Sequence, residues 1–199
     1  MTRYWAARIA LIVLIALLYF GWSSGLQAQD NDNRLIVAPD RGYSTIDAAL
    51  AAASPGDVIE VHEGIYTAPL IIEKSVSLVG VGQPVIDGQG MGSLVIITVP
   101  DVQFEGFVVR NSGTNINHED TAIVIQAPRV TVANNIIEDV LFGIYFADAG
   151  EGTAHHNIVR CLDRELGLRG DGIRVWYSNN VTVTENVVAG CRDMLIWYA

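Results

Sequence analysis

The feature that most constrains the fold is a short pattern that returns in the last third of the sequence. Val130-Thr-Val-Ala-Asn-Asn135-Ile-Ile and Val181-Thr-Val-Thr-Glu-Asn186-Val-Val are two copies of it, and Thr153-Ala-His-His-Asn157-Ile-Val is a degenerate third. The asparagines recur at intervals of 22 and 29 residues. A period of about 20–30 residues is typical of solenoid proteins, in which each repeat forms one structural unit and stacks on its neighbours.

A second short apolar run follows each copy of the pattern. These runs begin at Gly143, Gly172 and Met194, so they recur at intervals of 29 and 22 residues. Two runs with a period of two fit strands, and they leave no room for a helix inside a repeat. The sequence therefore predicts an all-β fold, a right-handed parallel β-helix whose coils pair with the coils before and after.

The recurring asparagines, Asn135, Asn157 and Asn186, occupy equivalent places in successive coils. We expect them to stack at one inward bend, about 4.8 Å apart, which is the spacing of neighbouring strands. Their amides would satisfy the backbone groups of the bend, and each other, away from water. The alternative is that asparagine occurs there only because it tolerates the left-handed backbone of a turn.

The N-terminal residues 1–28 have the features of a secretion signal. Two arginines precede an apolar run over residues 9–20, and Ala28 closes a stretch suited to cleavage. The run has 12 residues, fewer than the roughly 20 that span a membrane, and a retained anchor is the alternative. We expect an exported, periplasmic protein whose mature chain begins with a polar linker, residues 29–34.

Residues 35–199 form one predicted β-helix domain, with an N-terminal cap over residues 35–61 and coils over residues 62–199. Residues 44–47 resemble a capping box, with aspartate in place of glutamate, and predict an alanine-rich helix over residues 46–53. Such a helix can cover the open edge and apolar lumen of the first coil, which would otherwise favour aggregation. No closing element follows the last predicted strand, so we expect a C-terminally truncated fragment of a longer solenoid.

The charge excludes one class of partner, and the cysteine content allows a covalent link. The net charge is −10, Lys74 is the single lysine, and the eleven arginines are scattered, so no basic face is available for nucleic acid. Cys161 and Cys191 are expected near the same corner of neighbouring coils. In an oxidising compartment they can form a disulfide, and free buried thiols are the alternative.

Alternation within the second runs separates inward from outward side chains. The residues predicted to point inward are Ile144, Phe146, Ile173, Val175 and Leu195. The predicted outward columns are Val124, Tyr145, Arg174 and Ile196 in one, and Gln126, Ala147, Trp176 and Tyr198 in the next. Tyr145, Arg174, Trp176 and Tyr198 then form an exposed patch that can stack on sugar rings or bind another protein. Alternatively, a neighbouring loop or further coils cover this patch.

Two aspartates, Asp171 and Asp193, precede the second runs of adjacent coils and lie 22 residues apart. Stacked on adjacent coils, their carboxylates would be about 5 Å apart, the separation found in retaining glycosidases. This pair is the candidate catalytic site. Against it, aspartate after a turn commonly accepts hydrogen bonds from the backbone, and Arg169 and Arg192 lie close enough in the sequence to neutralise the pair.

The candidate metal ligands are His155, His156 and Met194. Two adjacent histidines in a strand point to opposite faces, so they cannot chelate one metal together without a bend. A copper site could instead combine one of them with a methionine thioether or a cysteine thiolate, the soft ligands that suit Cu(I). The alternative is that both histidines are ordinary surface side chains.

Residues 169–178, Arg-Gly-Asp-Gly-Ile-Arg-Val-Trp-Tyr-Ser, and residues 190–197, Gly-Cys-Arg-Asp-Met-Leu-Ile-Trp, resemble the NosD family. The resemblance extends to residues 45–61 and to Gly143-Ile-Tyr, and it covers the chain from Leu35 onward. It implies a soluble exported accessory protein that works with an ABC transporter and a copper chaperone. Together they would assemble the copper–sulfur cluster of nitrous oxide reductase, an enzyme of denitrification. It also implies membrane association only through these partners, and copper binding that is at most transient.

Two functional hypotheses follow. The first is a non-enzymatic maturation scaffold that uses the exposed aromatic patch and the widest predicted insertion, residues 161–169, as its contact surface. The second is a polysaccharide-binding or polysaccharide-degrading β-helix enzyme that uses Asp171 and Asp193. The first is favoured because the sequence places no lysine near the aspartates, no histidine beside them in the same runs, and no aspartate-rich calcium loop.

Overall fold

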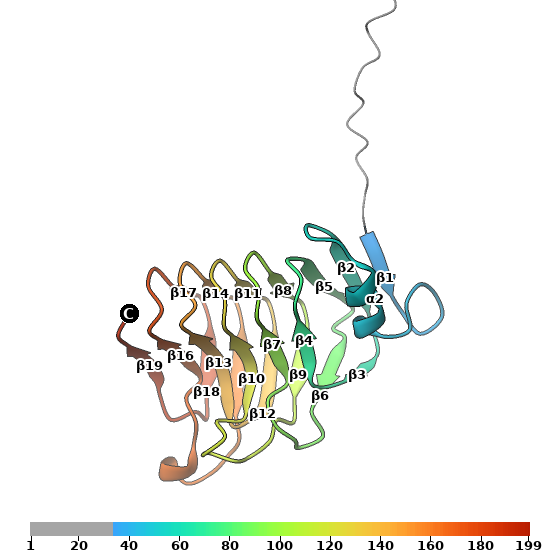
Figure 1. The fold of residues 1–199 in the computed structure, drawn as a ribbon. Coiled ribbons are helices and arrows are strands. Elements are labelled where there is room, and N and C mark those ends of the chain that lie inside the picture. Colours follow the sequence, from blue (N-terminus) through green and yellow to red (C-terminus); the bar gives the residue numbers. More distant parts are fainter. Residues whose placement is uncertain (1–33) are drawn as a thin grey trace, which may run out of the picture. The chain divides into compact units, whose positions relative to one another are not determined.

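The structure, a computed structural model, describes residues 34–199, whose strands wind into a parallel solenoid (Figure 1). The predicted all-β solenoid is confirmed. The helical elements of these residues are α2 (Ile46–Ala52) and a single 3-10 turn, η1 (Leu166–Leu168). None of the helices in this part of the chain has the length and hydropathy needed to cross a bilayer. The predicted signal peptide, residues 1–28, lies outside the described residues.

Each full coil adds one strand to each of three sheets. Sheet A has seven strands, in the order β1 (Arg34–Val37), β2 (Val58–His62), β5 (Ser77–Val81), β8 (Gln103–Glu105), β11 (Thr131–Ala133), β14 (Thr153–His155) and β17 (Thr182–Thr184). Sheet B has six, in the order β3 (Ile65–Thr67), β6 (Val85–Asp87), β9 (Val108–Arg110), β12 (Ile136–Val140), β15 (Ile158–Cys161) and β18 (Val187–Ala189). Sheet C has six, in the order β4 (Leu70–Ile72), β7 (Val95–Ile97), β10 (Thr121–Ile125), β13 (Phe142–Ala147), β16 (Ile173–Trp176) and β19 (Met194–Trp197).

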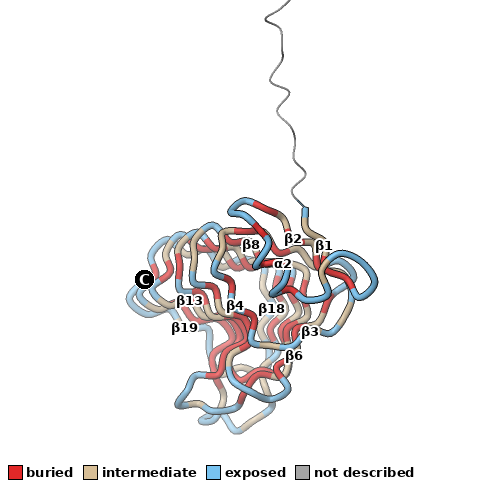
Figure 2. The backbone as a smooth tube through the Cα atoms, turned by 45° about the vertical axis from the view of Figure 1, so that its right-hand side comes forward, coloured by how far each residue is buried: buried red, intermediate tan, exposed pale blue. Residues whose placement is uncertain are grey.

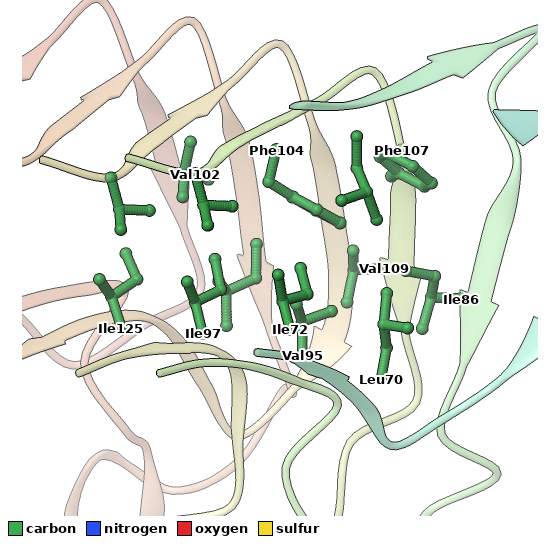
Figure 3. Close-up of a cluster of buried hydrophobic side chains, with 14 of the residues drawn as sticks. Leu70, Ile72, Ile86, Val95, Ile97, Val102, Phe104, Phe107, Val109 and Ile125 are labelled. Carbon is green, nitrogen blue, oxygen red and sulfur yellow. The ribbon is translucent and has the colours of Figure 1, made fainter. Parts of the chain in front are cut away.

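Side chains that alternate inward along the strands form one continuous apolar core. Figure 2 shows buried residues recurring along the successive coils. In sheet C, for example, Ile72, Ile97 and Ile125 lie in register on successive coils and are fully buried (Figure 3). β-Branched residues suit such rows because they have few χ1 rotamers to lose and pack well on a pleated surface. Each coil therefore extends the core by one layer. Burial of its apolar surface stabilises the fold by about 25 cal/mol per Å² removed from water.

The N-terminal end of the core is covered by α2, as the sequence predicts. The buried residues of this helix are Ile46, Ala49 and Leu50. Its N-cap is Thr45, whose Oγ1 accepts a hydrogen bond from the Ala48 amide at 3.2 Å. The predicted start of the helix at Ile46 is confirmed, and the helix ends at Ala52, one residue before the predicted end.

The segment predicted as a cap, residues 35–61, supplies part of the first coil. It contributes most of β1, together with α2 and most of β2, and β1 pairs with β2 in parallel. Arg34, at the end of the predicted linker, is already in sheet A, opposite Val58. In the sequence, the helix thus lies between two strands that pair directly with each other.

A ladder of three asparagines, Asn135, Asn157 and Asn186, lines the bend between sheets A and B. The amide oxygen of Asn157 accepts hydrogen bonds from the backbone N–H and the side-chain amide of Asn135, at 3.1 and 3.0 Å. Asn186 holds Asn157 in the same way, with both distances 2.9 Å. Each side-chain amide also donates to a carbonyl of the preceding coil; these carbonyls belong to Phe104, Val132 and Ala154. Among the described residues, no buried side-chain nitrogen or oxygen lacks a hydrogen-bond partner.

The spacing of the last two strands of sheet C differs from the predicted spacing by one residue. Met194 lies beside Ile173, an interval of 21 residues rather than 22. The Gly172 N–H donates to the carbonyl of Asp193 at 2.8 Å. Asp193 therefore takes the place beside Gly172 that the sequence assigned to Met194.

This shift changes the predicted columns only in the last coil. Four of the five predicted inward residues are confirmed as buried: Ile144, Phe146, Ile173 and Val175. The fifth, Leu195, is wrong, because it lies beside the outward Arg174. Ile196 lies in register with the inward Val175, and Trp197 takes the place predicted for Tyr198.

The two cysteines are joined. Cys161 at the end of β15 and Cys191 in the turn after β18 form a disulfide, with their Cα atoms 4.9 Å apart. Of the two alternatives that the sequence leaves open, the structure contains the bridge, which ties neighbouring coils together beside sheet C.

Candidate functional site

The candidate site lies on the outer face of sheet C, where the strands present columns of side chains. One column contains Val124, Tyr145, Arg174 and Leu195, in register on successive coils. Arg174 is only 8% exposed, and its guanidinium lies over the rings of Phe142, at 4.7 Å, and Tyr145, at 5.0 Å. Cation–π contacts gain strength when they are removed from water. Arg174 is therefore a fixed part of this face.

Arg174 is also the centre of a chain of ion pairs that runs along the solenoid. Its Nη1 donates to Glu119 at 2.6 Å and its Nε donates to Asp171 at 2.9 Å. The second carboxylate oxygen of Asp171 accepts from Nη2 and Nε of Arg192, at 2.8 and 3.2 Å. Burial lowers the pKa of Arg174, but the hydrogen bonds to Glu119 and Asp171 outweigh it, so the pKa is raised above its ordinary value. The guanidinium stays charged and held in place.

The two aspartates proposed as a catalytic pair do not lie at equivalent places. Asp193 lies beside Gly172, one position away from Asp171, because of the 21-residue interval. Asp171 is 1% exposed, and its two oxygens are occupied by Arg174 and Arg192. A buried carboxylate neutralised in this way is a poor general acid and a poor nucleophile.

Four aromatic side chains lie beside Arg174, and we refer to them as the aromatic ladder: Trp176, Tyr177, Trp197 and Tyr198. Trp176 stacks on Trp197, with ring centroids 5.5 Å apart and 24° between the ring planes. Tyr177 stacks on Tyr198 in the next column, at 4.7 Å and 16°. Each of these two coils thus contributes one indole and one phenol at the same two places.

The observed ladder overlaps the predicted patch but is not identical to it. Trp176 and Tyr198 are in both, whereas Tyr177 and Trp197 were missed. The signal that could have found them is the repeated Trp-Tyr dipeptide, at residues 176–177 and again at residues 197–198. Those two dipeptides are separated by 21 residues, the interval that the strands adopt.

Two shallow depressions flank Trp176 on this face. One, of about 300 Å³, is lined by Ala147, Asp148, Trp176 and Tyr177. The other, also of about 300 Å³, is lined by Glu119, Tyr145, Arg174, Trp176 and Leu195. The surface is therefore shaped around the partly buried indole of Trp176, with Glu119 and Arg174 on one side and Ala147 and Asp148 on the other.

The Gly-Asp-Gly motif before β16 positions the buried aspartate and arginine. A Cβ on Gly170 would overlap the carbonyl oxygen of Leu141, and one on Gly172 would overlap the side chain of Val188. Only glycine lets the chain approach the preceding and following coils so closely at these two places. The motif is therefore explained by close packing, which holds the ion chain in position.

A family of known proteins shares this architecture. The family model described as "Right handed beta helix region" matches residues 85–199, more than half of the chain. The chain belongs to this β-helix family. Two curated relatives, each named "Probable ABC transporter binding protein NosD", are 29% identical to it over 137 residues in Stutzerimonas stutzeri and over 133 residues in Pseudomonas aeruginosa. The protein is thus a NosD-like right-handed β-helix.

The similarity covers only part of those relatives. Each alignment includes 65% of this chain, but 30% of the Stutzerimonas protein and 31% of the Pseudomonas protein. The chain therefore spans less than a third of the length of the curated relatives it matches.

Two solved structures also resemble the chain. One, a rhamnogalacturonan lyase, has a TM-score of 0.47 and 12% identity, covering 83% of this chain and 62% of the lyase. The other, a pectin methylesterase from Aspergillus niger, has a TM-score of 0.44 and 14% identity, covering 79% of this chain and 86% of the esterase.

A loop of this NosD-like β-helix extends beside the ion chain. It contains η1, whose Leu166 and Leu168 are 65% and 51% exposed. Arg164 Nη1 donates to the carbonyl of Thr114 at 3.3 Å, which ties this loop to the loop between β9 and β10. Arg169 Nη2 donates to Asp163 at 3.1 Å within the same loop. Two leucines are thus presented to solvent on a loop held at both ends.

The predicted metal ligands fall into two separate places. The backbone of His156 has a φ of 55°, so the chain bends between the two histidines and both side chains can lie on one side. Nδ1 of His155 lies 2.9 Å from Nδ1 of His156. His156 Nε2 also lies 2.7 Å from the Glu185 carboxylate. Met194, however, belongs to β19 in sheet C, whereas the histidines lie in and just after β14 of sheet A.

These donors do not fit a complete copper site. Both cysteines are in the disulfide, so neither offers a thiolate. Within residues 34–199, no group of three or more His, Cys, Asp or Glu side chains could hold a metal ion. The histidine pair alone offers two ring nitrogens, and His156 is already paired with Glu185.

Proposed function

We propose that this chain is part of an exported accessory protein that associates with an ABC transporter and assists assembly of the copper cluster of nitrous oxide reductase. Similarity to two proteins named as ABC transporter binding proteins supports the transporter association. The copper-cluster role rests on the resemblance of residues 169–178 and 190–197 to the NosD family.

The observation that favours a scaffold over an enzyme is the state of Asp171. It is buried and hydrogen-bonded to two arginines, so it fixes the outer face of sheet C and is not available for acid–base or nucleophilic chemistry. A surface on which Asp171 and Arg174 are already paired, and whose backbone is held by glycine packing, is suited to contacts with another protein.

Export to the periplasm is part of the proposal. The features of residues 1–28 support it, since a charged start, an apolar run and small residues are typical of a secretion signal. The disulfide between Cys161 and Cys191 also supports it, because disulfides persist in oxidising compartments. In this proposal the protein meets the membrane through the transporter.

Copper would be an ion that the assembled proteins pass on, and not a resident cofactor of this chain. The described residues offer a two-nitrogen histidine pair and no larger donor group, which suits a passing ion better than a resident cofactor. The copper chaperone and the reductase are then the partners that hold the metal before and after transfer.

The proposed contact surface combines the aromatic ladder with the exposed leucines of η1. Exposed apolar side chains that border paired charges resemble the core and rim of a protein interface. Leu166 and Leu168 are the residues whose replacement by charged side chains should weaken association without entering the core.

The experiment is a complementation test in a denitrifying bacterium that lacks the gene. We expect nitrous oxide reductase from the deletion strain to contain little cluster copper, and the wild-type gene to restore copper content and nitrous oxide reduction. The double variant Leu166→Asp/Leu168→Asp should restore both poorly and should co-purify less transporter.

Met91→Asp is the control for added charge, because Met91 is 68% exposed on a different loop and its replacement adds one negative charge where the double variant adds two. It should complement as the wild type does. Fully copper-loaded reductase in the deletion strain would contradict the proposed role, and equal failure of the control would show a general effect of added charge.

A further inference from the structure

We propose that the aromatic ladder contains a binding site for the pyranose ring of a neutral glycan, at the place where Ala147 leaves the ladder open. This goes beyond the proposed association with a transporter. It shares the aromatic ladder with the proposed contact surface, but it is tested by sugar binding and not by association with the transporter.

The coil that precedes Trp176 has no aromatic side chain at the corresponding places of the ladder. Ala147 lies in register with Trp176, and the Asp148 N–H donates to the Trp176 carbonyl, so Asp148 stands before Tyr177 in the neighbouring column. Two small side chains therefore occupy the places where later coils carry an indole and a phenol. The depression of about 300 Å³ lined by Ala147, Asp148, Trp176 and Tyr177 is the space that the missing rings would fill.

The open place is one ring thick. Trp176 and Trp197 stack at a centroid separation of 5.5 Å, which shows the spacing at which this column accepts flat groups. A ring bound over Ala147 would continue the same stack against Trp176. The C–H groups on one side of a pyranose form a flat apolar surface that suits an aromatic face.

Two polar side chains border this place. Asp148 is exposed beside it, and Gln126, one coil earlier in the same column, is exposed below it. Neither side chain has a hydrogen-bond partner within residues 34–199. Hydroxyl groups around the rim of a sugar ring would supply partners for both, which is how polar groups fix orientation in a binding site.

The polar border also argues against an aromatic side chain from a partner protein as the occupant. A phenyl ring would stack on Trp176 equally well, but it carries no rim groups to pair with Asp148 and Gln126. Covering unpaired polar groups with an apolar ring costs free energy. A sugar therefore fits the described surface better.

The charges around the site select neutral sugars over acidic ones. Asp148 and Glu119 are both acidic, and the nearest buried cation, Arg174, is already bound to Glu119 and Asp171. Arg129 is bound to Asp101 in the same manner. With a net charge of −10 for the whole chain, a uronate would meet repulsion and no available cation.

The test titrates the purified chain with four neutral hexasaccharides, cellohexaose, xylohexaose, mannohexaose and maltohexaose, and with the acidic hexagalacturonate. Calorimetry and tryptophan fluorescence are the readouts. We expect at least one neutral hexasaccharide to bind and to change the fluorescence, and hexagalacturonate to bind at least about tenfold more weakly.

Ala147→Trp is the decisive variant because it fills the open place with the ring that the ladder lacks. It should reduce binding by about tenfold or more, and Trp176→Ala should do the same by removing the stacking surface. Circular dichroism should show the fold of both variants unchanged. Thr182→Trp, which adds an indole to an exposed position of sheet A, is the matched control and should bind as the wild type does.

Three results would overturn the proposal. They are the absence of binding by all four neutral hexasaccharides, binding that survives Ala147→Trp with the fold intact, and a preference for hexagalacturonate. None of these outcomes depends on the transporter or on copper, so this proposal and the proposed function can fail separately.

Discussion

The asparagine ladder and the aromatic ladder are made by the same repeat, yet one lies inside the coils and the other lies on the outer face of sheet C. Inside, each amide donates and accepts in a fixed pattern, and the interior members Asn135 and Asn157 are buried. Outside, two rings stack on two others, and the next place in the column is left open at Ala147. Stacking is thus obligatory in one ladder and optional in the other.

The difference follows from what a missing member would cost. A buried amide that loses its neighbour leaves a donor or acceptor unpaired, at about 1–3 kcal/mol for each group. An exposed ring that loses its neighbour is solvated instead. The inner ladder can begin only where the chain offers a substitute: Phe107 stands at the equivalent place, donates its N–H to Asn135 at 3.0 Å, and stacks on Phe104.

The contrast also explains what could be predicted from the sequence. The intervals of 22 and 29 residues between asparagines place the inner ladder correctly, because an amide that must bond to the next amide fixes the register of the chain. The second runs have no such anchor. Alignment by apolar character alone matches Gly172 to Met194, whereas the strands adopt an interval of 21 residues.

The surroundings of Arg174 were not predictable for another reason. Alternation places this residue outward, and an outward arginine is expected to be exposed. It is covered because Glu119, 55 residues away in a loop outside the repeat, reaches across to it, and because Phe142 and Tyr145 lie under its guanidinium. The path of a loop that does not repeat cannot be deduced from a period.

Between the two ladders, the largest effect that we expect is on the inner one. Asn157→Ala should lower the free energy of unfolding by about 3 kcal/mol, because it leaves the buried N–H of Asn135 without an acceptor and the Val132 carbonyl without its donor. Chemical denaturation measures this. Asn179→Ala, at an exposed position, is the matched control and should cost less than about 0.5 kcal/mol. Equal losses in the two variants would remove the distinction between the inner and outer positions.

The next effect tests whether every residue on the outer face can be replaced with little loss of stability. Arg174→Met should cost about 2 kcal/mol, because it leaves the buried Asp171 with Arg192 as its remaining partner. Arg160→Met, which removes an arginine that is 55% exposed and 3.9 Å from Glu138, should change the free energy of unfolding by less than about 0.5 kcal/mol. A small loss for Arg174→Met would mean that the ion chain is not structural.

A smaller effect is expected from the aromatic ladder itself. Trp176→Ala should cost about 1 kcal/mol, because its contacts with the rings of Tyr177, Trp197 and Tyr198 lie on the partly solvated outer face. Phe146→Ala, which removes an inward ring in the neighbouring strand, should cost about 4 kcal/mol. Denaturation of both variants under one set of conditions compares them, and a larger loss for Trp176→Ala would place the ring in the core.

The smallest effect concerns pH and the outer face of sheet B. The Asn111 side-chain amide, the Gln89 N–H and Arg110 all donate to Asp87, and together they hold the pKa of that carboxyl below its ordinary value. Asp87 therefore stabilises the fold above its unfolded pKa, and this contribution is lost as the pH falls through its lower folded pKa.

Asp87→Asn should accordingly be less stable than the wild type near neutral pH and should lose less stability between about pH 5 and about pH 3. Unfolding midpoints measured at several pH values test this, with Asp40→Asn, a change at an exposed position, as the control. An identical pH dependence for Asp87→Asn and the wild type would contradict the assignment.

The most direct test of the account is a double-mutant cycle on the inner ladder, from the unfolding free energies of Asn135→Ala, Asn157→Ala and the double variant. Because the Asn157 amide oxygen accepts both the N–H and the side-chain amide of Asn135, we predict a coupling energy of about 1–2 kcal/mol. Losses that add within about 0.5 kcal/mol would show that the asparagines act independently, and would contradict the claim that stacked side chains set the register of the coils.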